Sequence, residues 1–276
     1  MEHTLTCLRT IMQESSGDNL AFTKNKLKRY LQILLLDFLY AKPPYSTLYF
    51  YGGTCLAHCF GLPRLSEDLD FVDMNGSIAL PKLAKDIEQF FAQETDLSVT
   101  TKIQKFRIYV KFDILRPLKL VSPSESSIMF VKLEICPLFH YCPKYTAQFI
   151  PLFLENKSII VRTFDLPTLM ATKIGAVLNR KWKKIDRAGK TIIAVKGRDY
   201  FDLLWYMQKG IKPNIECIAG IKNMAELKKR LLILVEQVDE RSLQLDLAAF
   251  IADQNFVKNV GTHTKAILLR EIREKF

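Results

Sequence analysis

The stretch Tyr51–Val72 constrains the fold more than any other part of the chain; it reads YGGTCLAHCFGLPRLSEDLDFV. It combines a glycine pair, a short segment with helical potential and two acids at the start of an apolar run. The aromatic run Leu48–Tyr51 precedes it and predicts a buried strand. Gly52 and Gly53 then predict a tight turn at the end of that strand.

A short helix is expected after this turn, because Thr54 is a good N-cap and Gly61 is a good residue just beyond a helix end. Asp68 and Asp70 follow in a segment where polar and apolar residues alternate. Side chains alternate between the two faces of a strand, so both carboxylates are expected on one face. Two carboxylates on one face can share a divalent cation.

This arrangement is typical of phosphoryl or nucleotidyl transfer. Mg²⁺, or Mn²⁺ in its place, takes oxygen ligands and is usually held by one or two carboxylates together with substrate phosphates. Gly52 and Gly53 let backbone N–H groups approach a triphosphate, and the helix N-terminus behind them favours an anion. Thr54 or Ser66 could add a hydroxyl contact. One half of the stretch therefore predicts a metal site, and the other half predicts a phosphate site.

The pattern GGT-x-LA-x(3)-G-x(2)-R-x-S-x-DLDF, from Gly52 to Phe71, resembles the signature of the AbiEii/AbiGii-type nucleotidyltransferase toxins. That family lies within the DNA polymerase β-like nucleotidyltransferase superfamily. A glycine turn and an acidic strand face would explain the glycines and the acids separately, but not together with Arg64 and Ser66. The resemblance implies an α/β (α+β) core with a small mixed sheet, and it implies nucleotide contacts for Arg64 and Ser66.

Two later strands each offer one further carboxylate. Residues 106–114 and 128–135 both alternate, and their polar faces carry Asp113 and Glu134 respectively. In polymerase β-like enzymes a third acid on a neighbouring strand completes the metal site, and the run KLEI at 132–135 resembles that strand. We therefore prefer Glu134 to Asp113 as the third metal ligand, or as the group that activates the acceptor hydroxyl.

The second half of the chain resembles the family in two more motifs. Lys173 and Arg180 fit K-x-x-A-x(3)-R, while Asp199 and Asp202 fit R-D-x-x-D-L. In the family the lysine contacts nucleotide phosphates, and an acid of the second motif is needed for activity. The resemblance therefore implies catalytic roles for Lys173 and Asp199, with Asp202 as the alternative acid. Considered alone, these residues would be a solvated lysine and a structural salt-bridge cluster.

A densely basic segment, 180–191, separates these two motifs and contains one tryptophan, Trp182. Cations interleaved with an aromatic residue suit nucleic acid, because lysines contact phosphates and an indole can stack on a base. The alternative is a solvated loop with its tryptophan in the core. The residues predicted to contact RNA are Arg180, Lys181, Lys183, Lys184 and Lys190.

Two domains are expected. Residues 1–150 would form the nucleotidyltransferase core with N-terminal helices, and 151–276 would form a helical domain that completes the nucleotide cleft. Residues 1–45 have apolar positions at helical spacing, and 136–151 are rich in proline and aromatic residues and predict a linker.

The net charge of +11 and the pI near 9.3 favour a polyanionic partner. The N-terminus lacks the features of a signal peptide, and the longest apolar run is interrupted by Asp37, so we expect a cytoplasmic protein without a membrane partner. The 6 cysteines include no C-x-x-C pair, which predicts reduced thiols.

Together these features predict a Mg²⁺-dependent enzyme that moves a nucleoside monophosphate from an NTP to a macromolecule. The resemblance implies a toxin neutralised by a cognate antitoxin, and in some members of the family the acceptor is the 3′ end of tRNA. Two alternatives stay open. The acceptor could be a protein side chain, or the chain could be a binding module for nucleotide or RNA without catalysis.

Overall fold

The computed structural model describes residues 3–137, 142, 144–180, 184–185, 191–193 and 195–276. The chain forms two compact units. Unit 1 comprises Met1–Gly61, Leu65–Phe139 and Gln148–Thr163, and unit 2 comprises Leu62–Arg64, His140–Ala147 and Phe164–Phe276. Unit 1 thus extends beyond the expected boundary at residue 150, and a short piece of the signature stretch belongs to unit 2.

Unit 1 is built on a seven-stranded mixed sheet with the order β3-β4-β5-β2-β1-β7-β6. The β2–β5 and β1–β7 pairs are parallel, whereas β1–β2, β3–β4 and β4–β5 are antiparallel. The sheet confirms the predicted α/β class. The strands are β1 (Tyr49–Tyr51), β2 (Leu69–Asp73), β3 (Val99–Gln104), β4 (Arg107–Asp113), β5 (Ile128–Pro137), β6 (Ala147–Leu154) and β7 (Lys157–Phe164).

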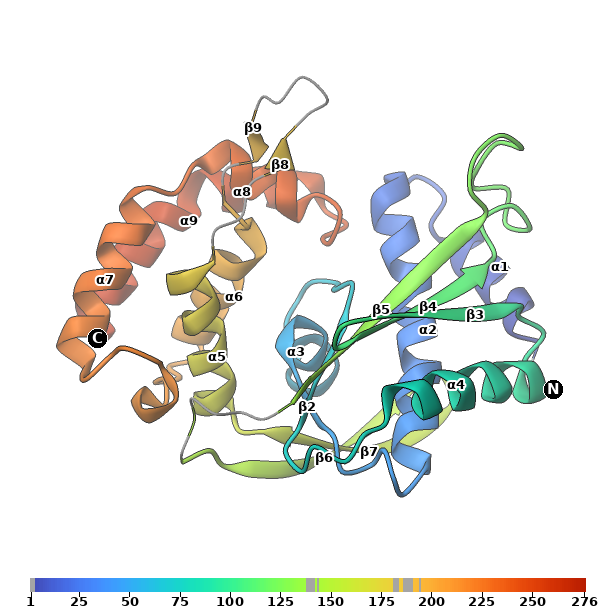
Figure 1. Ribbon diagram of the computed structural model, residues 1–276. Helices are drawn as coiled ribbons and strands as arrows, with labels where there is room; N and C mark the ends of the chain where they lie inside the picture. The colour runs from blue at the N-terminus through green and yellow to red at the C-terminus, as the bar shows by residue number, and fades with distance from the viewer. Residues whose placement is uncertain (1–2, 138–141, 143, 181–183, 186–190, 194) are drawn as a thin grey trace. The chain divides into compact units, whose positions relative to one another are not determined.

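Four helices accompany this sheet among the described residues of unit 1. The longest, α2, begins where the side chain of Asn19 accepts a hydrogen bond from Phe22 N at 2.8 Å. Figure 1 shows α4 running alongside β3 and β4. The helices are α1 (Thr4–Glu14), α2 (Leu20–Ala41), α3 (Gly52–Phe60) and α4 (Leu80–Glu94).

Aromatic side chains fill much of the unit 1 core. Phe50 of β1 stacks on Phe71 of β2 with ring centroids 5.2 Å apart. Phe91 of α4 meets Phe112 of β4 edge to face at 5.1 Å, and both side chains are fully buried. These contacts fix α4 on the sheet, because each large buried ring contributes several kcal/mol.

The predicted linker over 136–151 is wrong in its second part, because β6 begins at Ala147 and joins the edge of the sheet. A two-residue turn, Glu155-Asn156, connects β6 to β7, and both residues have positive φ, as a type I′ hairpin requires. The sequence did not predict β6 because Pro151 lies within it and proline is unusual inside a strand. Proline is tolerated on an edge strand, where its missing N–H faces away from the ladder.

Unit 2 is mainly helical, as predicted, and α6 contacts α5, α8 and α9 (Figure 1). The N-cap of α5 is Asp165, whose side chain accepts from Thr168 N at 3.0 Å. No helix in the described parts of the chain is both long and apolar enough to cross a bilayer. The elements are α5 (Leu166–Asn179), β8 (Lys184–Ile185), β9 (Thr191–Ile193), α6 (Gly197–Gln208), a 3₁₀ turn (Ile215–Cys217), α7 (Met224–Glu236), α8 (Glu240–Leu247) and α9 (Gln254–Lys275).

The expectation that all cysteines are reduced is wrong for one pair, because Cys142 and Cys217 form a disulfide. They are 75 residues apart in sequence and meet only through the fold of unit 2. Cys7, Cys55 and Cys136 are free thiols, as is Cys59.

Replacing Phe91 with alanine should lower the free energy of unfolding by about 3–5 kcal/mol, because it leaves a cavity between α4 and β4. Urea unfolding followed by far-UV circular dichroism measures this change. Gln93→Ala, an exposed position on the same helix, should stay within about 0.5 kcal/mol of wild type. Equal stability of the two variants would contradict the packing role of Phe91.

Candidate functional site

Three carboxylates project from one face of the unit 1 sheet. Asp70 of β2 lies directly opposite Glu134 of β5 in the parallel register. Asp68 stands two residues before Asp70, so its side chain projects from the same face. Asp113 lies opposite Ile128, at the other end of the β4–β5 pair. Of the two residues considered for the third acid, the register therefore places Glu134 beside the acid pair.

Two cations hold two of these carboxylates, Asp68 and Glu134. Lys132 Nζ lies 2.9 Å from Asp68 Oδ2 and 2.5 Å from Glu134 Oε1, and Arg107 Nε lies 3.0 Å from the same Glu134 oxygen. Burial by itself would lower the pKa of Lys132, but the Asp68 and Glu134 carboxylates raise it to about 12. A positive charge therefore already occupies the space between two of the acids.

The N-terminus of α3 opens beside Asp70. Tyr51 is the N-cap residue and pairs with Asp70 across β1 and β2, and the helix begins at Gly52. Gly52 has φ +80°, and a Cβ there would lie 2.2 Å from Asp70 Oδ2. The carboxylate of Asp70 thus occupies the space that a side chain at position 52 would need, next to the first helical turn, whose backbone N–H groups have no acceptor within the helix.

Thr54 does not cap the helix, because the N-cap of α3 is Tyr51, three residues earlier than the sequence predicted. Its buried hydroxyl donates to the backbone carbonyl of Asp68. The backbone carbonyl of Ser66 in turn accepts from Gln32 Nε2 at 3.0 Å. These bonds tie α3 and α2 to the residues just before β2 and so fix the position of the acid pair.

Arg64 lies in unit 2, buried against α6. Its Nε and Nη2 atoms donate to the two oxygens of Asp202, both at 2.6 Å. A bidentate guanidinium–carboxylate pair is strong and geometrically specific. The guanidinium of Arg64, which the sequence assigned to nucleotide binding, is thus bound to Asp202 in the structure.

Lys173 of α5 connects the two acids of α6. Its Nζ lies 3.0 Å from Asp199 Oδ1 and 2.8 Å from Asp202 Oδ2. Burial opposes the charge on Lys173, but Asp199 and Asp202 keep its pKa above the ordinary value. Burial likewise opposes the charge on Asp199, yet Lys173, Arg180 and Lys196 lower its pKa to about 2. The cluster therefore remains ionised at neutral pH.

Part of the predicted RNA-binding segment can be placed. Arg180 follows α5 and forms an ion pair with Asp199. Lys184 lies in β8. Lys181, Lys183 and Lys190 lie outside the described residues, so their proposed contacts with RNA stay predictions.

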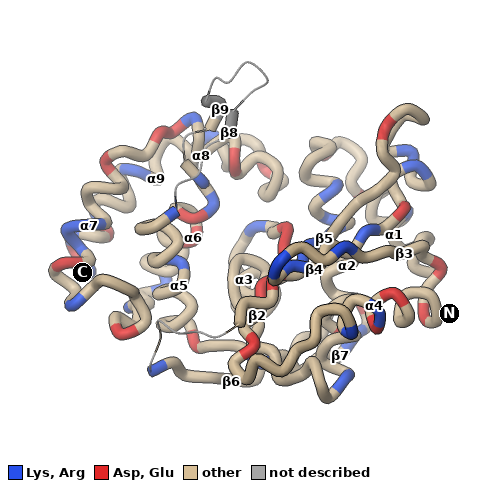
Figure 2. Tube along the Cα trace, in the orientation of Figure 1, with Lys and Arg blue, Asp and Glu red and all other residues tan. Residues whose placement is uncertain are grey.

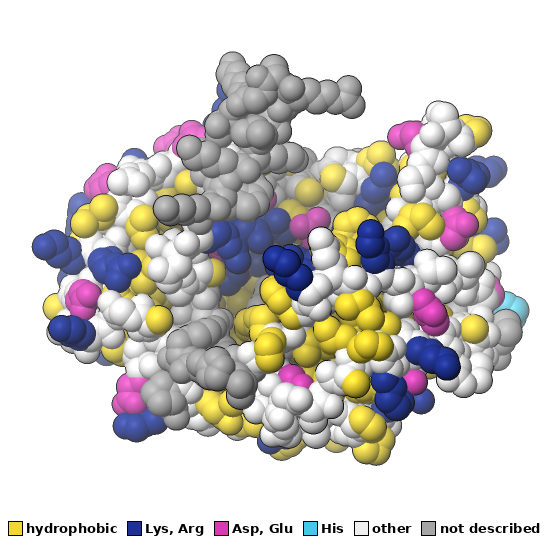
Figure 3. Space-filling view, in the orientation of Figure 1, with side chains coloured by type: hydrophobic (Ala, Val, Ile, Leu, Met, Phe, Trp, Pro, Cys, Tyr) yellow, Lys and Arg dark blue, Asp and Glu magenta, His cyan; other side chains and the backbone are white. Residues whose placement is uncertain are grey.

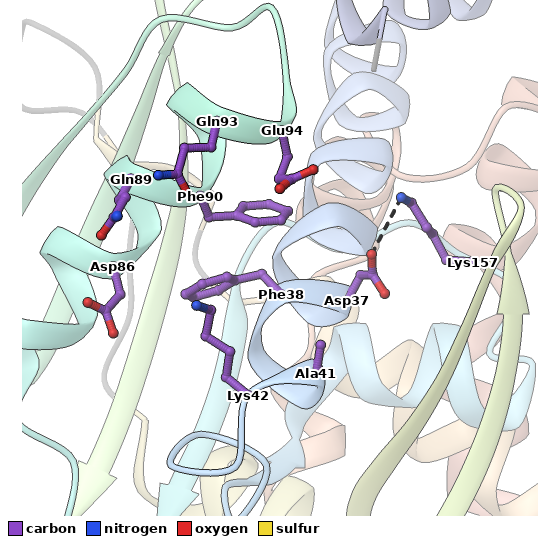
Figure 4. A pocket seen from close by; sticks show the side chains of 10 residues that line it. All are labelled: Asp37, Phe38, Ala41, Lys42, Asp86, Gln89, Phe90, Gln93, Glu94 and Lys157. Atoms are coloured by element: carbon purple, nitrogen blue, oxygen red, sulfur yellow. Dashed lines mark ion pairs between the residues drawn. The ribbon is translucent and has the colours of Figure 1, made fainter. Parts of the chain in front are cut away.

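A cavity of about 510 Å³ elsewhere in unit 1 was not expected from the sequence (Figure 4). Residues of α2 and α4 line it, together with Lys157 of β7, which pairs with Asp37 at 3.5 Å. The rings of Phe38 and Phe90 are 4.9 Å apart in its wall. It contains none of the predicted site residues, so it is separate from the carboxylate centre.

Residues 33–265 match the family described as "Nucleotidyl transferase AbiEii toxin, Type IV TA system". The chain belongs to the AbiEii family. The matched range includes the glycine pair, all three carboxylates and the Lys173 cluster, so the resemblance noted from the motifs is confirmed. Membership makes the chain a nucleotidyltransferase toxin of a toxin–antitoxin system.

One solved structure supports this fold. MenT4, a nucleotidyltransferase toxin from Mycobacterium tuberculosis H37Rv, is similar with a TM-score of 0.54 and 11% identity over 96% of this chain and 88% of that one. JHP933 from Helicobacter pylori matches with a TM-score of 0.47 and 18% identity over 90% of this chain and 92% of that one. No curated protein matches the sequence.

The AbiEii site fits a divalent metal through its acid pair. Among the described residues no group of three acid, histidine or cysteine side chains converges as a ready metal site. Mg²⁺ needs only one or two protein carboxylates when substrate phosphates supply the other ligands. The Lys132 ammonium between Asp68 and Glu134 shows that these oxygens accept a cation at this place.

Gly52→Ala should abolish most nucleotidyl transfer, because the new methyl group would displace the Asp70 carboxylate. Gly61→Ala, at the other end of α3, is the matched control: its φ is +73° and its Cβ would meet nothing within 4 Å. Both variants should lose about 1 kcal/mol of stability to backbone strain, and only Gly52→Ala should lose activity. Equal activity of the two, measured as labelling from a radioactive NTP, would contradict the Asp70 contact.

Acid should destabilise unit 2 as the pH falls from about 4 towards 2, because folding lowers the pKa of Asp199 from 3.8 to about 2. The contribution, about 2 kcal/mol, is present above the unfolded pKa and lost as the folded carboxylate protonates. Both tryptophans, Trp182 and Trp205, belong to unit 2, so their fluorescence reports its urea midpoint. As the pH falls from 4 to 2, the stability of Asp199→Asn should decrease less than that of wild type; equal decreases would contradict the assignment.

Proposed function

We propose that this AbiEii protein transfers a nucleoside monophosphate from an NTP to the 3′ end of a tRNA, with Mg²⁺ or Mn²⁺ as cofactor. The observation that carries the proposal is the placement of Asp68, Asp70 and Glu134 on one sheet face beside the N-terminus of α3. Carboxylates that bind a hard cation and a helix end that favours anions together form a site for a metal-bound triphosphate.

In the proposed reaction the acceptor hydroxyl oxygen attacks the α-phosphorus of the NTP. A new P–O bond forms to the acceptor, the bond between the α-phosphorus and the bridging oxygen breaks, and pyrophosphate leaves. The metal, held by Asp68 and Asp70, would supply charge neutralisation at the phosphates. Glu134 would be a third ligand or would take the hydroxyl proton, and backbone N–H groups at Gly52 and Gly53 would bind phosphate oxygens.

We assign Lys173 to phosphate binding on the strength of the family motif. Two acids keep Lys173 charged within unit 2, which a phosphate-binding cation requires. Asp199 would position this lysine, and Asp202 would position both Lys173 and Arg64. Because the cluster is buried, loss of the lysine would affect both folding and catalysis, and stability must be measured alongside turnover.

Charge supports an RNA acceptor. The charge of +11 agrees with RNA, and the basic segment after α5 agrees with it as well. The family also implies an antitoxin partner. Incubating the pure protein with each labelled NTP, a divalent metal, total tRNA and cell lysate shows which macromolecule takes the label. Labelled protein in place of tRNA would support nucleotidylation of a side chain, and no label would support a binding module.

Asp68→Asn and Asp70→Asn should each reduce nucleotidyl transfer at least about 100-fold, because each removes a charge aimed at the metal and the phosphates. Neither change alters the shape of the side chain, so the fold should persist. The assay is incorporation of label from an NTP into tRNA at several Mg²⁺ concentrations.

Asp113→Asn is the matched control, since it removes an exposed acid from the far end of the same sheet. It should keep wild-type turnover. Full activity of Asp70→Asn, or an equal loss in Asp113→Asn, would refute the placement of the metal at the β2–β5 pair.

A further inference from the structure

One face of strands β3, β4 and β5 carries a row of cations and aromatic rings that the reaction as proposed does not use. The opposite face is apolar, and its side chains from β4 and β5 are buried in the core: Ile108, Val110, Phe112, Met129, Val131 and Leu133. We define the β3–β5 face by the outward residues Lys102, Tyr109, Lys111, Ile128 and Phe130.

The β3–β5 face continues directly into the carboxylate centre. Phe130, Lys132 and Glu134 alternate along β5, so they project from the same side of the sheet. At about 3.3 Å per residue, Phe130 lies about 13 Å along the strand from Glu134. A linear polymer that ran along β5 with its end at the acids would therefore have its preceding units over this face.

Phe130 is the aromatic centre of the face. It is 45% exposed, although large apolar rings are usually buried. Tyr109 meets its edge at 5.7 Å, and Lys28 Nζ lies 5.3 Å from its ring centroid. The ring is thus held in place by neighbours while part of its surface remains open to a stacking partner.

The cations of the face differ from those of the metal centre. Lys132 and Arg107 are held by acids, whereas neither Lys102 nor Lys111 has an ion-pair partner within the described part of the chain. Lys111 stands directly opposite Phe130, and Lys102 stands opposite Tyr109. Figure 2 shows Lys and Arg recurring along β4 and β5, and the space-filling view shows such side chains over these strands (Figure 3).

Single-stranded RNA fits this chemistry. Unpaired bases stack on exposed aromatic rings of a sheet, and lysines beside the rings contact phosphates. A protein partner fits less well, because interface cores are depleted of lysine. The acid Asp113 lies at the far end of the face, away from the carboxylate centre.

We propose that the β3–β5 face binds the single-stranded 3′-terminal segment of the acceptor RNA, with a base stacked on Phe130 and phosphates on Lys102 and Lys111. The proposal rests on the proposed function, since it assumes an RNA acceptor whose terminal hydroxyl is delivered to the acids. It adds a second RNA contact surface, in unit 1, to the basic segment of unit 2.

The test is the affinity of the full chain for a short, unstructured, dye-labelled oligoribonucleotide, measured by fluorescence anisotropy between about 50 and 200 mM salt. Phe130→Ala should weaken binding about 5- to 100-fold without changing the salt slope. The double variant Lys102→Gln/Lys111→Gln should weaken binding and reduce the slope by about 1.4, or about 0.7 for each lost phosphate contact. Neither variant should change the KM for the NTP.

Two controls match these changes. Phe153→Ala removes a ring that is 77% exposed on β6, and Lys85→Gln removes an exposed cation on α4. Both should bind RNA as wild type does. Thermal unfolding checks that all variants are folded.

The outcomes separate this proposal from the proposed function. If wild type binds and labels RNA while the Phe130 and lysine variants behave like their controls, the β3–β5 face is refuted and RNA nucleotidyl transfer stands. If wild type neither binds nor labels RNA but labels a protein, both the acceptor assignment and this face are refuted. Selective loss of binding in the β3–β5 variants supports the proposal.

Discussion

The parallel pairing of β2 with β5 is the constraint on which the candidate site depends. It sets Asp70 beside Glu134, and a shift of one residue would turn one of these carboxylates into the apolar core. The core side chains next to these acids in sequence, Phe71 and Leu133, are fully buried, so the hydrophobic burial that stabilises the sheet also fixes the acids. The register of β2 on β5 therefore determines both the burial of the core side chains and the positions of the acids.

The second constraint is the close approach of Asp70 to Gly52. Because the Asp70 carboxylate occupies the place of a side chain at position 52, the strand and the helix N-terminus come nearer than a residue with a Cβ at that position would permit. Thr54 adds a buried hydrogen bond to the carbonyl of Asp68. The acids are thus supported from behind by α3, which leaves their oxygens for cations.

Charge is distributed differently in the two units. In unit 1 the acids are paired with Lys132 and Arg107 at a partly exposed face, where a metal and phosphates could replace these partners. In unit 2 the acids Asp199 and Asp202 are buried with their cations, and breaking any one pair would leave an uncompensated charge in the interior. The first arrangement suits ligand exchange, and the second suits the fixed positioning of Lys173.

The sequence by itself determined the family, the strand and the short helix of the signature, and the shared face of Asp68 and Asp70; the tight turn predicted at Gly52 and Gly53 is instead the first turn of α3. These follow from local rules: a period of two in a strand, the freedom of glycine and the spacing of one continuous motif. The same local pattern predicted the strand that carries Glu134, but it placed Asp113 on an equally suitable strand.

Only the tertiary structure shows that Glu134, and not Asp113, lies beside Asp70, because strand order and register depend on packing between residues far apart in sequence. It also moved Arg64 into unit 2, where it binds Asp202, 138 residues away. The β6–β7 hairpin and the Cys142–Cys217 disulfide were equally invisible to local pattern. The row of Lys102, Lys111 and Phe130 exists only once three strands pair, since no periodicity within a single strand brings those side chains together.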